Sequence, residues 1–504
     1  MKIFTAQEIR EIDRYTIESE GISSLELIER AADAIACEIT ARWQPSKPIT
    51  IFAGPGNNGA DALATALLLI EQGYTPHIYL FNIGGDKLRP ECVTCRNRLI
   101  EIGYEHLNEV INRFIPPELN SNDLVIDGLF GSGLNKPLES GFKSLVQHIN
   151  ASGATIVSID VPSGLHCDWN NNAIHRDIIH ANLTLALQTP RLAFFISDNA
   201  ELIGEWKVFD IGLSAHKMRL LPTQYHLVEK QEVKRIMRPR KEFSSKADYG
   251  HAILFAGSLG MAGAATLAAQ GALRAGLGKL TVHSPIACTN IIQNVIPEAI
   301  LETDPHERII TSMALQHNYS AIAIGPGIGN NDLTVAPLSS LIKNTTNPII
   351  LDADALNCIA KRPSLLSCLP SFSILTPHEG EFDRLFGAHH STQARLQKAI
   401  EITKRYNIFI VLKGRYTAIV RPDGKIFFNS SGNPGMATPG SGDVLTGIIL
   451  AMLAQGYEPE IAVTIAVYVH GLAGDIATET HSQYGVLASD IAANVGRAIR
   501  NILG

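Results

Sequence analysis

"PITIFAGPGNNGAD", residues 48–61, joins an apolar run to a glycine-rich turn and then to the start of a helix. The run has the length and composition of a strand buried on both faces, and the turn admits only small side chains. Similar runs recur along the chain after it, separated by helical segments. We therefore predict a parallel sheet with helices on both faces, the doubly wound α/β class.

The N-terminal half contains the clearest alternation of strands and helices. Its predicted strands are "PITIFAG", "PHIYLF", "DLVIDG" and "ATIVSID", and its predicted helices lie near residues 60–72, 90–101 and 139–150. Before them, Thr5 with Glu8 and Ser23 with Glu26 have the spacing of capping boxes. We expect two helices there that pack as an antiparallel pair, and we interpret this pair as structural.

A charged segment with several prolines, residues 214–247, interrupts the alternation and is the predicted domain boundary. A second α/β series follows, with predicted strands "HAILFAG", "KLTVHS", "AIAIGPG", "PIILDAD", "FSILTP" and "FIVLKG" and a hairpin that turns at residues 422–424. The two halves show no detectable repeat. A length of 504 residues fits two large domains.

Composition narrows the class of protein. The chain is 45% hydrophobic and 18% charged with a net charge of −7, which is typical of a folded soluble protein and argues against nucleic acid or an anionic membrane as a partner. The N-terminus is charged where a signal peptide is apolar, and no run of about 18 uninterrupted apolar residues occurs, so we expect a cytoplasmic protein without a membrane span.

Seven cysteines are scattered along the chain, as is typical of reduced thiols. Cys92 and Cys95 form a C-x-x-C pair, but no second pair completes a zinc site. We interpret them as part of a surface helix rather than as a metal or redox centre.

Three turns at the carboxyl ends of predicted strands carry polar residues: "GPGNNGAD" (54–61), "DGLFGSGLNKP" (127–137) and "IDVPSG" (159–164). One such turn alone is often only structural. Because ligands of doubly wound sheets bind at this edge, the three together indicate a site. Asn58, Asp127 and Ser163 offer hard oxygen ligands that suit an alkali or alkaline-earth cation.

These turns, behind the segment "EIREIDRYTIESEGISSLELIERAA", resemble the NAD(P)H-hydrate epimerase domain of the YjeF N-terminal type over residues 1–214. The resemblance implies a Rossmann-like domain that interconverts the R and S forms of NADHX and NADPHX, the products of water addition to the nicotinamide ring. It implies K⁺ at Asn58, Asp127 and Ser163, and Asp160 as the proton-transfer group. It also implies nucleotide contacts for Asn57, Asn58, Gly59, Ala60, Asp61, Gly131, Ser132, Gly133, Leu134, Asn135, Lys136, Pro137 and Asp160.

Two positions in this half depart from the family pattern. Ala60 stands where the family has Gly, and Ser132 stands where it has Thr. Alanine would tighten the loop if this position needs a positive φ, whereas serine keeps the hydroxyl.

In the C-terminal half, "ATPGSGDVLTG" (437–447) delivers one carboxylate, Asp443, to the start of an apolar helix. Gly440, Ser441 and Gly442 allow successive amides to point inward as an anion-binding nest, where the helix dipole also favours negative charge. These amides would stabilise Asp443 as a carboxylate that accepts a proton from a substrate hydroxyl. Alternatively, Asp443 only satisfies amide donors in the first turn.

A glycine-rich anion hole followed by Asp resembles the ribokinase-like superfamily. Together with "GSLGMAGAA", "GPGIG", "LKGRYT" and "TPHEGEF", which has His378 in place of the kinases' Asn, it resembles the ADP-dependent NAD(P)H-hydrate dehydratases over residues 225–504. The resemblance implies that Asp443 is catalytic, that Glu381 keeps the acid associated with Mg²⁺, and that the S form loses water while ADP becomes AMP and phosphate. It implies hydrate contacts for Ala264, Gly327, His378 and Asp443, and nucleotide contacts for Lys413, Gly414, Arg415, Tyr416, Thr417 and Gly442.

Pro439 is a departure in this half, because the family frequently has Gly there and proline offers no amide to a phosphate. The loop and helix at residues 256–278, rich in Ala and Gly, fit either a ligand loop or close helix packing.

The two resemblances in one chain predict a bifunctional isomerase and lyase with NADHX, NADPHX and ADP as small-molecule substrates. They imply a homo-oligomer, a tetramer, with residues 215–224 as the linker between two domains. Two other hypotheses remain open: a vitamin or sugar kinase fused to a nucleotide-binding domain, and an N-terminal half that only senses a ligand or binds a partner. The choice of ADP over ATP rests on the resemblance alone.

Overall fold

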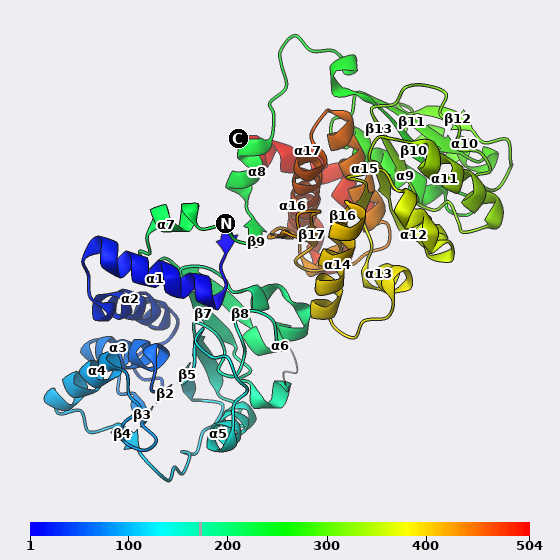
Figure 1. The fold of residues 1–504 in the computed structure, drawn as a ribbon. Helices are drawn as coiled ribbons and strands as arrows, with labels where there is room; N and C mark the ends of the chain where they lie inside the picture. The colour runs from blue at the N-terminus through cyan, green and yellow to red at the C-terminus, as the bar shows by residue number, and fades with distance from the viewer. Residues whose placement is uncertain (171–173) are drawn as a thin grey trace. The chain divides into compact units, whose positions relative to one another are not determined.

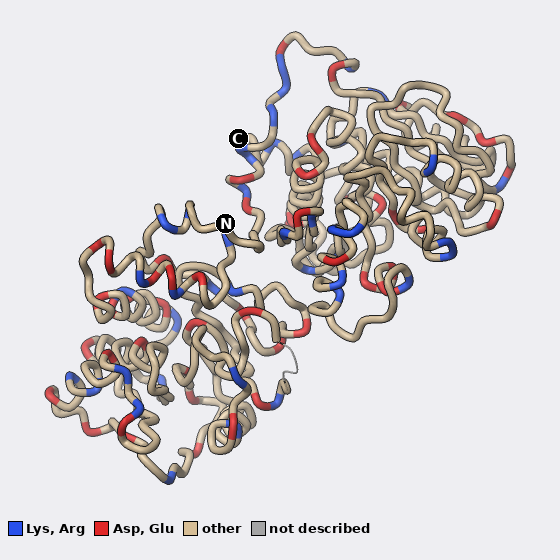
Figure 2. The backbone as a smooth tube through the Cα atoms, in the orientation of Figure 1, with Lys and Arg blue, Asp and Glu red and all other residues tan. Residues whose placement is uncertain are grey.

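The computed structural model describes residues 1–170 and 174–504 (Figure 1). The chain divides into two compact units, Lys2–Thr223 and Gln224–Gly504. Met1 is grouped with the second unit. Each unit has a central sheet with helices around it, as the alternation of apolar runs and helical segments predicts. Figure 2 shows that acidic and basic residues are interspersed along both units.

The N-terminal sheet is parallel throughout, in the order β4-β3-β2-β5-β6-β7-β8. Its strands are β2 (Ile49–Ala53), β3 (His77–Phe81), β4 (Leu107–Val110), β5 (Leu124–Gly128), β6 (Thr155–Ile159), β7 (Leu183–Leu187) and β8 (Glu205–Phe209). The short strand β1 (Lys2–Ile3) is not part of this sheet. Around it lie α1 (Ala6–Glu20), α2 (Ser24–Arg42), α3 (Asn57–Glu71), α4 (Pro90–Glu101), α5 (Ser140–Ala151), α6 (Ala200–Ile203) and α7 (Ala215–Leu220), with 3-10 turns at His175–Asp177, Leu192–Phe195 and Ser197–Asn199.

Alternate residues of one strand enter different cores, which confirms that both faces of this sheet are covered. Ile51 packs with the core residues of α2, α3 and α4, whereas Phe52 packs with those of α5. Both predicted capping boxes are formed at the starts of α1 and α2.

The turn after β2 brings backbone segments together so closely that only glycine fits. A Cβ at Gly54 would lie 1.8 Å from the carbonyl oxygen of Leu129, and a Cβ at Gly59 would lie 1.8 Å from that of Gly54. Ala60 is fully buried inside α3 and has no positive φ, so the alanine at this position causes no backbone strain.

Within the C-terminal unit the sheet is mixed, and the strands of this unit lie in the order β9-β18-β17-β16-β15-β14-β13-β10-β11-β12. Strand β17 pairs antiparallel with β16 and with β18. The hairpin formed by β17 and β18 confirms the predicted turn. Its strands are β9 (Tyr225–Val228), β10 (His251–Phe255), β11 (Lys279–Ser284), β12 (Ile300–Thr303), β13 (Ala321–Ile324), β14 (Ile349–Leu351), β15 (Ile374–Leu375), β16 (Phe409–Leu412), β17 (Ala418–Val420) and β18 (Ile426–Asn429).

The helices of this unit are α8 (Lys230–Ile236), α9 (Ala262–Arg274), α10 (Ile286–Val295), α11 (Asp332–Asn344), α12 (Ala353–Lys361), α13 (Glu379–Phe386), α14 (Thr392–Tyr406), α15 (Ser441–Ala454), α16 (Pro459–Gly485) and α17 (Ala488–Leu503). Short 3-10 turns span Lys246–Tyr249, Pro363–Cys368 and Pro434–Met436. The segment 214–247, which looked irregular in sequence, contains β9 and α8, because a short strand and a two-turn helix leave little periodic signal.

Small residues let α9 and α15 approach closely at the centre of the core. A Cβ at Gly271 would lie 2.4 Å from the carbonyl oxygen of Val444, and one at Gly447 would lie 1.9 Å from that of Ala268. Close helix packing therefore accounts for much of the Ala and Gly content of α9.

One helix, α16, is long and apolar enough to cross a membrane by length and composition alone. However, 67% of its apolar stretch is buried inside the protein, and it packs against α15 and α17 in the core. We therefore assign α16 to the core of the C-terminal unit rather than to a membrane.

Candidate active sites

The N-terminal unit has a cavity of about 530 Å³ at the carboxyl ends of its strands. Its walls include α1, α2 and the turns after β2, β5 and β6. The structure brings together residues from all three predicted turns, namely Asn57, Asn58, Asp61, Gly131, Ser132, Gly133, Leu134, Asn135 and Asp160. Gly59 and Ala60 are buried behind the first turn, and Lys136 and Pro137 are exposed beyond the cavity lining.

Asp160 is held in this cavity by bonds to both of its carboxylate oxygens. The amide of Ser132 donates to Oδ2 at 2.8 Å, and Arg191 donates to Oδ1 from Nη2 at 2.6 Å and from Nε at 3.0 Å. Its φ of 65° is rarely adopted by a residue other than glycine. This strained and fully bonded carboxylate is the fixed negative charge of the cavity.

Arg191 is the partner that the sequence analysis missed. Its side chain is buried at 2% exposure beneath the cavity. Burial alone would lower the pKa of the guanidinium, but the neighbouring Asp160 carboxylate and the Cys167 side chain raise it, so Arg191 keeps its charge. Its only signal in the sequence is a lone basic residue beside the apolar run "LAFFI".

Two further carboxyl groups, Asp13 and Asp61, face the same cavity. Burial, with the charges of Asp160 and Asp13, raises the pKa of Asp61 well above its ordinary value. Burial also raises the pKa of Asp13 to about 6; Arg191 lowers it, and Asp160 adds to the rise. Three acids thus share this cavity, and two of them, Asp160 and Asp13, interact with the guanidinium of Arg191.

The first two helices, which we interpreted as structural, also form part of the cavity wall. Side chains of α1 and α2 line the cavity, including Arg10 and Asp13 of α1. The polar residues on the inner side of α1 were the available signal, but helical periodicity alone cannot show what that side faces.

The predicted K⁺ ligands lie at the base of this edge of the sheet. Ser163 Oγ donates to Asp127 Oδ1 at 2.6 Å, and the Ser163 amide donates to Asp127 Oδ2 at 2.9 Å. Asn58 Nδ2 is buried without a partner, and a Cβ at Gly131 would lie 2.9 Å from Asn58 Oδ1. The donor set suits a hard cation, although Asp127 is fully engaged by neighbouring hydroxyl and amide groups, and burial raises its pKa.

The C-x-x-C pair lies on the inner face of a surface helix, α4, whose outer face, with Asn97 and Arg98, is exposed. Cys92 and Cys95 are fully buried on α4, which packs against α3. Burial raises the pKa of both thiols, so they stay protonated.

In the C-terminal unit, the ends of β14 and β16 place a buried ion pair beside the start of α15. Lys413 Nζ donates to Asp352 Oδ1 at 3.0 Å, and Thr446 Oγ1 donates to Asp352 Oδ2 at 2.7 Å. Lys413 Nζ also lies 3.8 Å from Glu381 Oε2. These carboxylates outweigh the effect of burial and raise the pKa of the Lys413 ammonium. Asp352, which is 1% exposed, was not among the predicted site residues.

The start of α15 lies against this ion pair. Gly440 is the N-cap with a φ of 88°, and a Cβ at Gly442 would lie 3.1 Å from Lys413 Nζ. Gly442 and Asp443 occupy the second and third helical positions, where amides have no carbonyl partner within the helix. Pro439 precedes the helix, so its lack of an amide does not remove any of the free amides at the start of α15.

Asp443 behaves differently from the prediction. The sequence favoured a carboxylate stabilised by amides, yet burial raises its pKa to about 7, and the charge of Asp352 adds to the rise while Lys413 lowers it. The helix N-terminus is too weak to offset burial beside other acids. A carboxyl group with this pKa can accept a proton near neutral pH.

The remaining predicted residues of the C-terminal unit differ in how exposed they are. Gly327, with a φ of 66°, would place a Cβ 3.1 Å from that of Ala264, and Asp354 accepts the amide of Gly329 at 2.9 Å. His378 is exposed and caps α13, with Nδ1 accepting the amide of Gly380 at 3.0 Å. The turn after β16 is formed by Gly414, Arg415, Tyr416 and Thr417, with Arg415 over the Tyr416 ring.

Several carboxyl groups, including Asp352, Glu381 and Asp443, lie near this site. Over residues 1–170 and 174–504, no group of three or more His, Cys, Asp and Glu side chains has metal-binding geometry. Glu381, for which the resemblance implies a role with Mg²⁺, accepts a hydrogen bond from the amide of His378 at 2.9 Å and is 7% exposed. This arrangement suits a cation held mainly by nucleotide phosphates, as Mg²⁺ usually is.

Comparison with known proteins gives matches along almost the whole chain. A family model described as NAD(P)H-hydrate dehydratase matches residues 252–497, and one described as YjeF-related protein N-terminus matches residues 24–193. The bifunctional NAD(P)H-hydrate repair enzyme Nnr of Thermofilum pendens is 32% identical, over 99% of this chain and 96% of that protein. The enzyme of the same name from Coxiella burnetii is 32% identical, over 97% of each chain.

Among solved structures, the ADP/ATP-dependent NAD(P)H-hydrate dehydratase from Bacillus subtilis, co-crystallised with ATP and Mg²⁺, is 36% identical. The match covers 55% of this chain and 98% of the Bacillus subtilis chain, and its TM-score is 0.49.

Proposed function

The chain belongs to the family of bifunctional NAD(P)H-hydrate repair enzymes, and from this premise we propose that it restores hydrated nicotinamide coenzymes in two steps. The N-terminal unit interconverts the R and S forms of NADHX and NADPHX. The C-terminal unit removes water from the S form with ADP and releases NAD(P)H, AMP and phosphate. The two activities together repair both epimers, because each S molecule that is consumed is replaced from R.

The observation that carries the proposal is the position of Asp443 beside the Lys413 ion pair at the start of α15. Its pKa of about 7 allows the carboxylate to take the proton of the ring hydroxyl as that oxygen attacks the β-phosphorus of ADP. AMP leaves, and the ring hydroxyl becomes a phosphate ester, which is a far better leaving group than hydroxide. Loss of phosphate and of a ring proton then restores the dihydropyridine.

The residues around Asp443 bind and orient the reactants. The amides of Gly442 and Asp443 point toward the β-phosphoryl group, where the helix dipole favours negative charge. Lys413 neutralises that charge and is itself fixed by Asp352. Mg²⁺ bound to the nucleotide phosphates would withdraw charge from the transferred group. Ala264, Gly327 and His378 form the hydrate subsite, and residues 413–417 the adenine nucleotide subsite.

In the N-terminal unit, the hydrated ring occupies the cavity beside Asp160. A fixed carboxylate there stabilises the ring cation that forms when the hydroxyl departs, and it accepts the proton of the water that adds to the other face. We further propose K⁺ at Asn58, Asp127 and Ser163, with the nucleotide along Asn57–Asp61 and Gly131–Pro137. The catalytic domains would span residues 1–214 and 225–504, joined by residues 215–224, in a cytoplasmic homotetramer.

The decisive experiment supplies NADHX as a mixture of epimers and follows the near-ultraviolet absorbance of the reduced nicotinamide ring with ADP and then with ATP. Recovery of NADH with release of AMP supports the proposal. A phosphorylated product that accumulates would indicate a vitamin or sugar kinase instead. Failure of added R hydrate to convert to S would indicate that the N-terminal unit only binds a ligand or a partner.

A further inference from the structure

We propose that Asp13 of α1 is a second catalytic residue of the epimerase cavity, the acid that gives its proton to the hydroxyl leaving the hydrated ring. This inference rests on the proposed epimerase function. It assigns a chemical role to a helix that lies outside residues 24–193, the segment matched by the family model.

The position of Asp13 in the cavity wall is the first support. It lies on the side of α1 that also presents Ile9, Arg10 and Ile17 to the cavity. Across the cavity, Asp61 enters from α3 and Asp160 from the end of β6. A ring bound between these walls therefore has a carboxyl group on the side of α1 as well as on the side of the sheet.

The bonding of the acids separates their roles. Both oxygens of Asp160 accept hydrogen bonds, one from Arg191 and the other from the Ser132 amide. Among the described residues, the structure gives the Asp13 carboxyl no hydrogen-bond partner, so its proton is available to a ligand. Asp61 is only 6% exposed and lies deeper in the wall. Asp13 is thus the acid most open to the substrate.

The charges that face Asp13 keep it protonated for part of the time near neutral pH. Arg191 favours its ionised form, whereas burial and the Asp160 carboxylate disfavour it, and the pKa rises to about 6. The wall formed by α2 presents Ser24, Leu27, Ile28 and Ala31, none of which titrates. Lys217 of α7, which packs against α1, is paired with Glu11. In many enzymes with two catalytic carboxyl groups, one group stays ionised and the other is protonated and acts as the acid.

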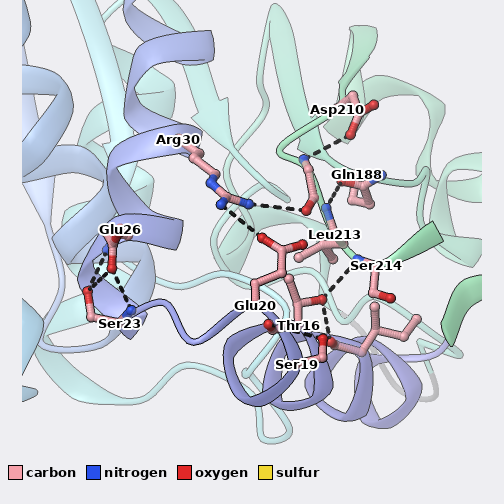
Figure 3. A network of polar contacts seen from close by, with 12 residues as sticks. Thr16, Ser19, Glu20, Ser23, Glu26, Arg30, Gln188, Asp210, Leu213 and Ser214 are labelled. Carbon is pink, nitrogen blue, oxygen red and sulfur yellow. Dashed lines mark hydrogen bonds and ion pairs between the residues drawn. The ribbon is translucent and has the colours of Figure 1, made fainter. Parts of the chain in front are cut away.

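Polar contacts one turn further along α1 fix its orientation (Figure 3). The Ser214 amide donates to Thr16 Oγ1 at 2.9 Å, and Thr16 Oγ1 donates to the carbonyl of Ile12 at 2.8 Å. Arg30 of α2 bonds both to Glu20 at the end of α1 and to the carbonyl of Gly212. Because Thr16 follows Asp13 by three residues, this network holds the acid at a constant position in the cavity.

The proposed step balances without another reactant. Asp13 donates its proton to the hydroxyl on the ring carbon next to the nitrogen, and the C–O bond breaks as the nitrogen lone pair forms a C=N bond. The water that leaves is replaced by a water that adds to the opposite face, giving its proton to Asp160. Return of that proton to Asp13 through solvent completes the cycle with inverted configuration at one carbon.

The test uses the full chain with purified R-NADHX, and chromatography separates the epimers. Asp13→Asn should lower kcat for epimerisation by about 100-fold or more with little change in KM, because the acid is lost while its shape is kept. In the parent chain we expect the rate to decline as pH rises above about 6, and the substitution should remove this decline. Glu18→Gln, which removes an exposed acid from the same helix, should match the parent chain.

Two measurements distinguish a variant that fails to fold from a variant that folds but has lost catalysis. Fluorescence of Trp43, Trp169 and Trp206, all in the N-terminal unit, reports whether that unit is folded, and Asp13→Glu should recover part of the lost rate. Asp13→Asn with kcat within about threefold of the parent chain, or with a reduced rate but an unchanged pH profile, would overturn the proposal. If the parent chain itself leaves R-NADHX unconverted, the epimerase function fails instead.

Discussion

Replacing Asp443 with asparagine should stabilise the C-terminal unit while it stops dehydration. In the folded chain the pKa of Asp443 is raised from 3.8 to about 7, chiefly by burial. As pH rises from about 4 to about 7, the unfolded chain releases this proton while the folded chain retains it, so the free energy of unfolding falls. The loss is complete above the folded pKa. Asparagine has no proton to release, so the variant escapes this loss.

The size of the effect follows from the shift. A change from 3.8 to about 7 corresponds to at most about 4 kcal/mol, at about 1.4 kcal/mol for each pKa unit. Asp443 is only partly buried, and solvent screening reduces this to about 1–2 kcal/mol. For a unit of this size, the midpoint of thermal unfolding should rise by about 2–6 °C at about pH 8.5. The gain should be less than half as large at about pH 5.

Calorimetry of the full chain measures the effect. All three tryptophans lie in the N-terminal unit, so fluorescence identifies the unfolding of that unit and the other transition belongs to the C-terminal unit. Glu479→Gln, which removes an exposed acid from α16, should shift the midpoint by no more than about 1 °C. An Asp443→Asn chain that is equally stable or less stable at the higher pH would refute the reasoning.

The activity of the same variant gives the second half of this prediction. Dehydration of S-NADHX should fall by about 100-fold or more, because no carboxylate accepts the hydroxyl proton. In the parent chain, kcat should rise as pH increases through about 7, where Asp443 becomes ionised. A variant that gains stability and loses activity would show that the site is held at a cost to the fold.

Three further substitutions test other parts of the structure. Asp160→Asn should stop interconversion of the epimers and leave dehydration of purified S-NADHX unchanged, as chromatography and absorbance can show. Lys413→Met leaves Asp352 buried without its cation, so calorimetry should show a loss of about 3 kcal/mol in the C-terminal unit together with loss of dehydration; a loss below about 1 kcal/mol would contradict the buried ion pair. Gly59→Ala places a methyl group 1.8 Å from a carbonyl oxygen and should lower the stability of the N-terminal unit by about 2 kcal/mol or more, whereas Gly56→Ala meets nothing within 4 Å and should be tolerated.

The sequence predicted features that depend on local pattern. Apolar runs, glycine turns and capping residues such as Thr5 and Ser23 are encoded within a few positions, and the structure has the corresponding strands, turns and caps. The hairpin at residues 422–424 belongs to the same class. The edge of the sheet where three polar turns meet could also be predicted, because parallel strands end on the same side.

The partners of the site residues could not be predicted, because they come from distant parts of the chain. Arg191 follows Asp160 by 31 residues, and Lys413 follows Asp352 by 61, so no local pattern links either pair. The raised pKa of Asp443 has the same origin, since it depends on burial and on charges from other strands. The role of α1 emerges only when the tertiary fold shows what its inner side faces.

The central claim is that one chain repairs both epimers of a hydrated coenzyme at two separate carboxylates. The most direct test incubates equal amounts of R- and S-NADHX with ADP and Mg²⁺ and measures the NADH formed by the parent chain, Asp160→Asn and Asp443→Asn. We predict that the parent chain converts all of the hydrate, that Asp160→Asn stops after the S fraction, and that Asp443→Asn forms almost none while still interconverting the epimers. Complete conversion by both variants, or no NADH from the parent chain, would contradict the account.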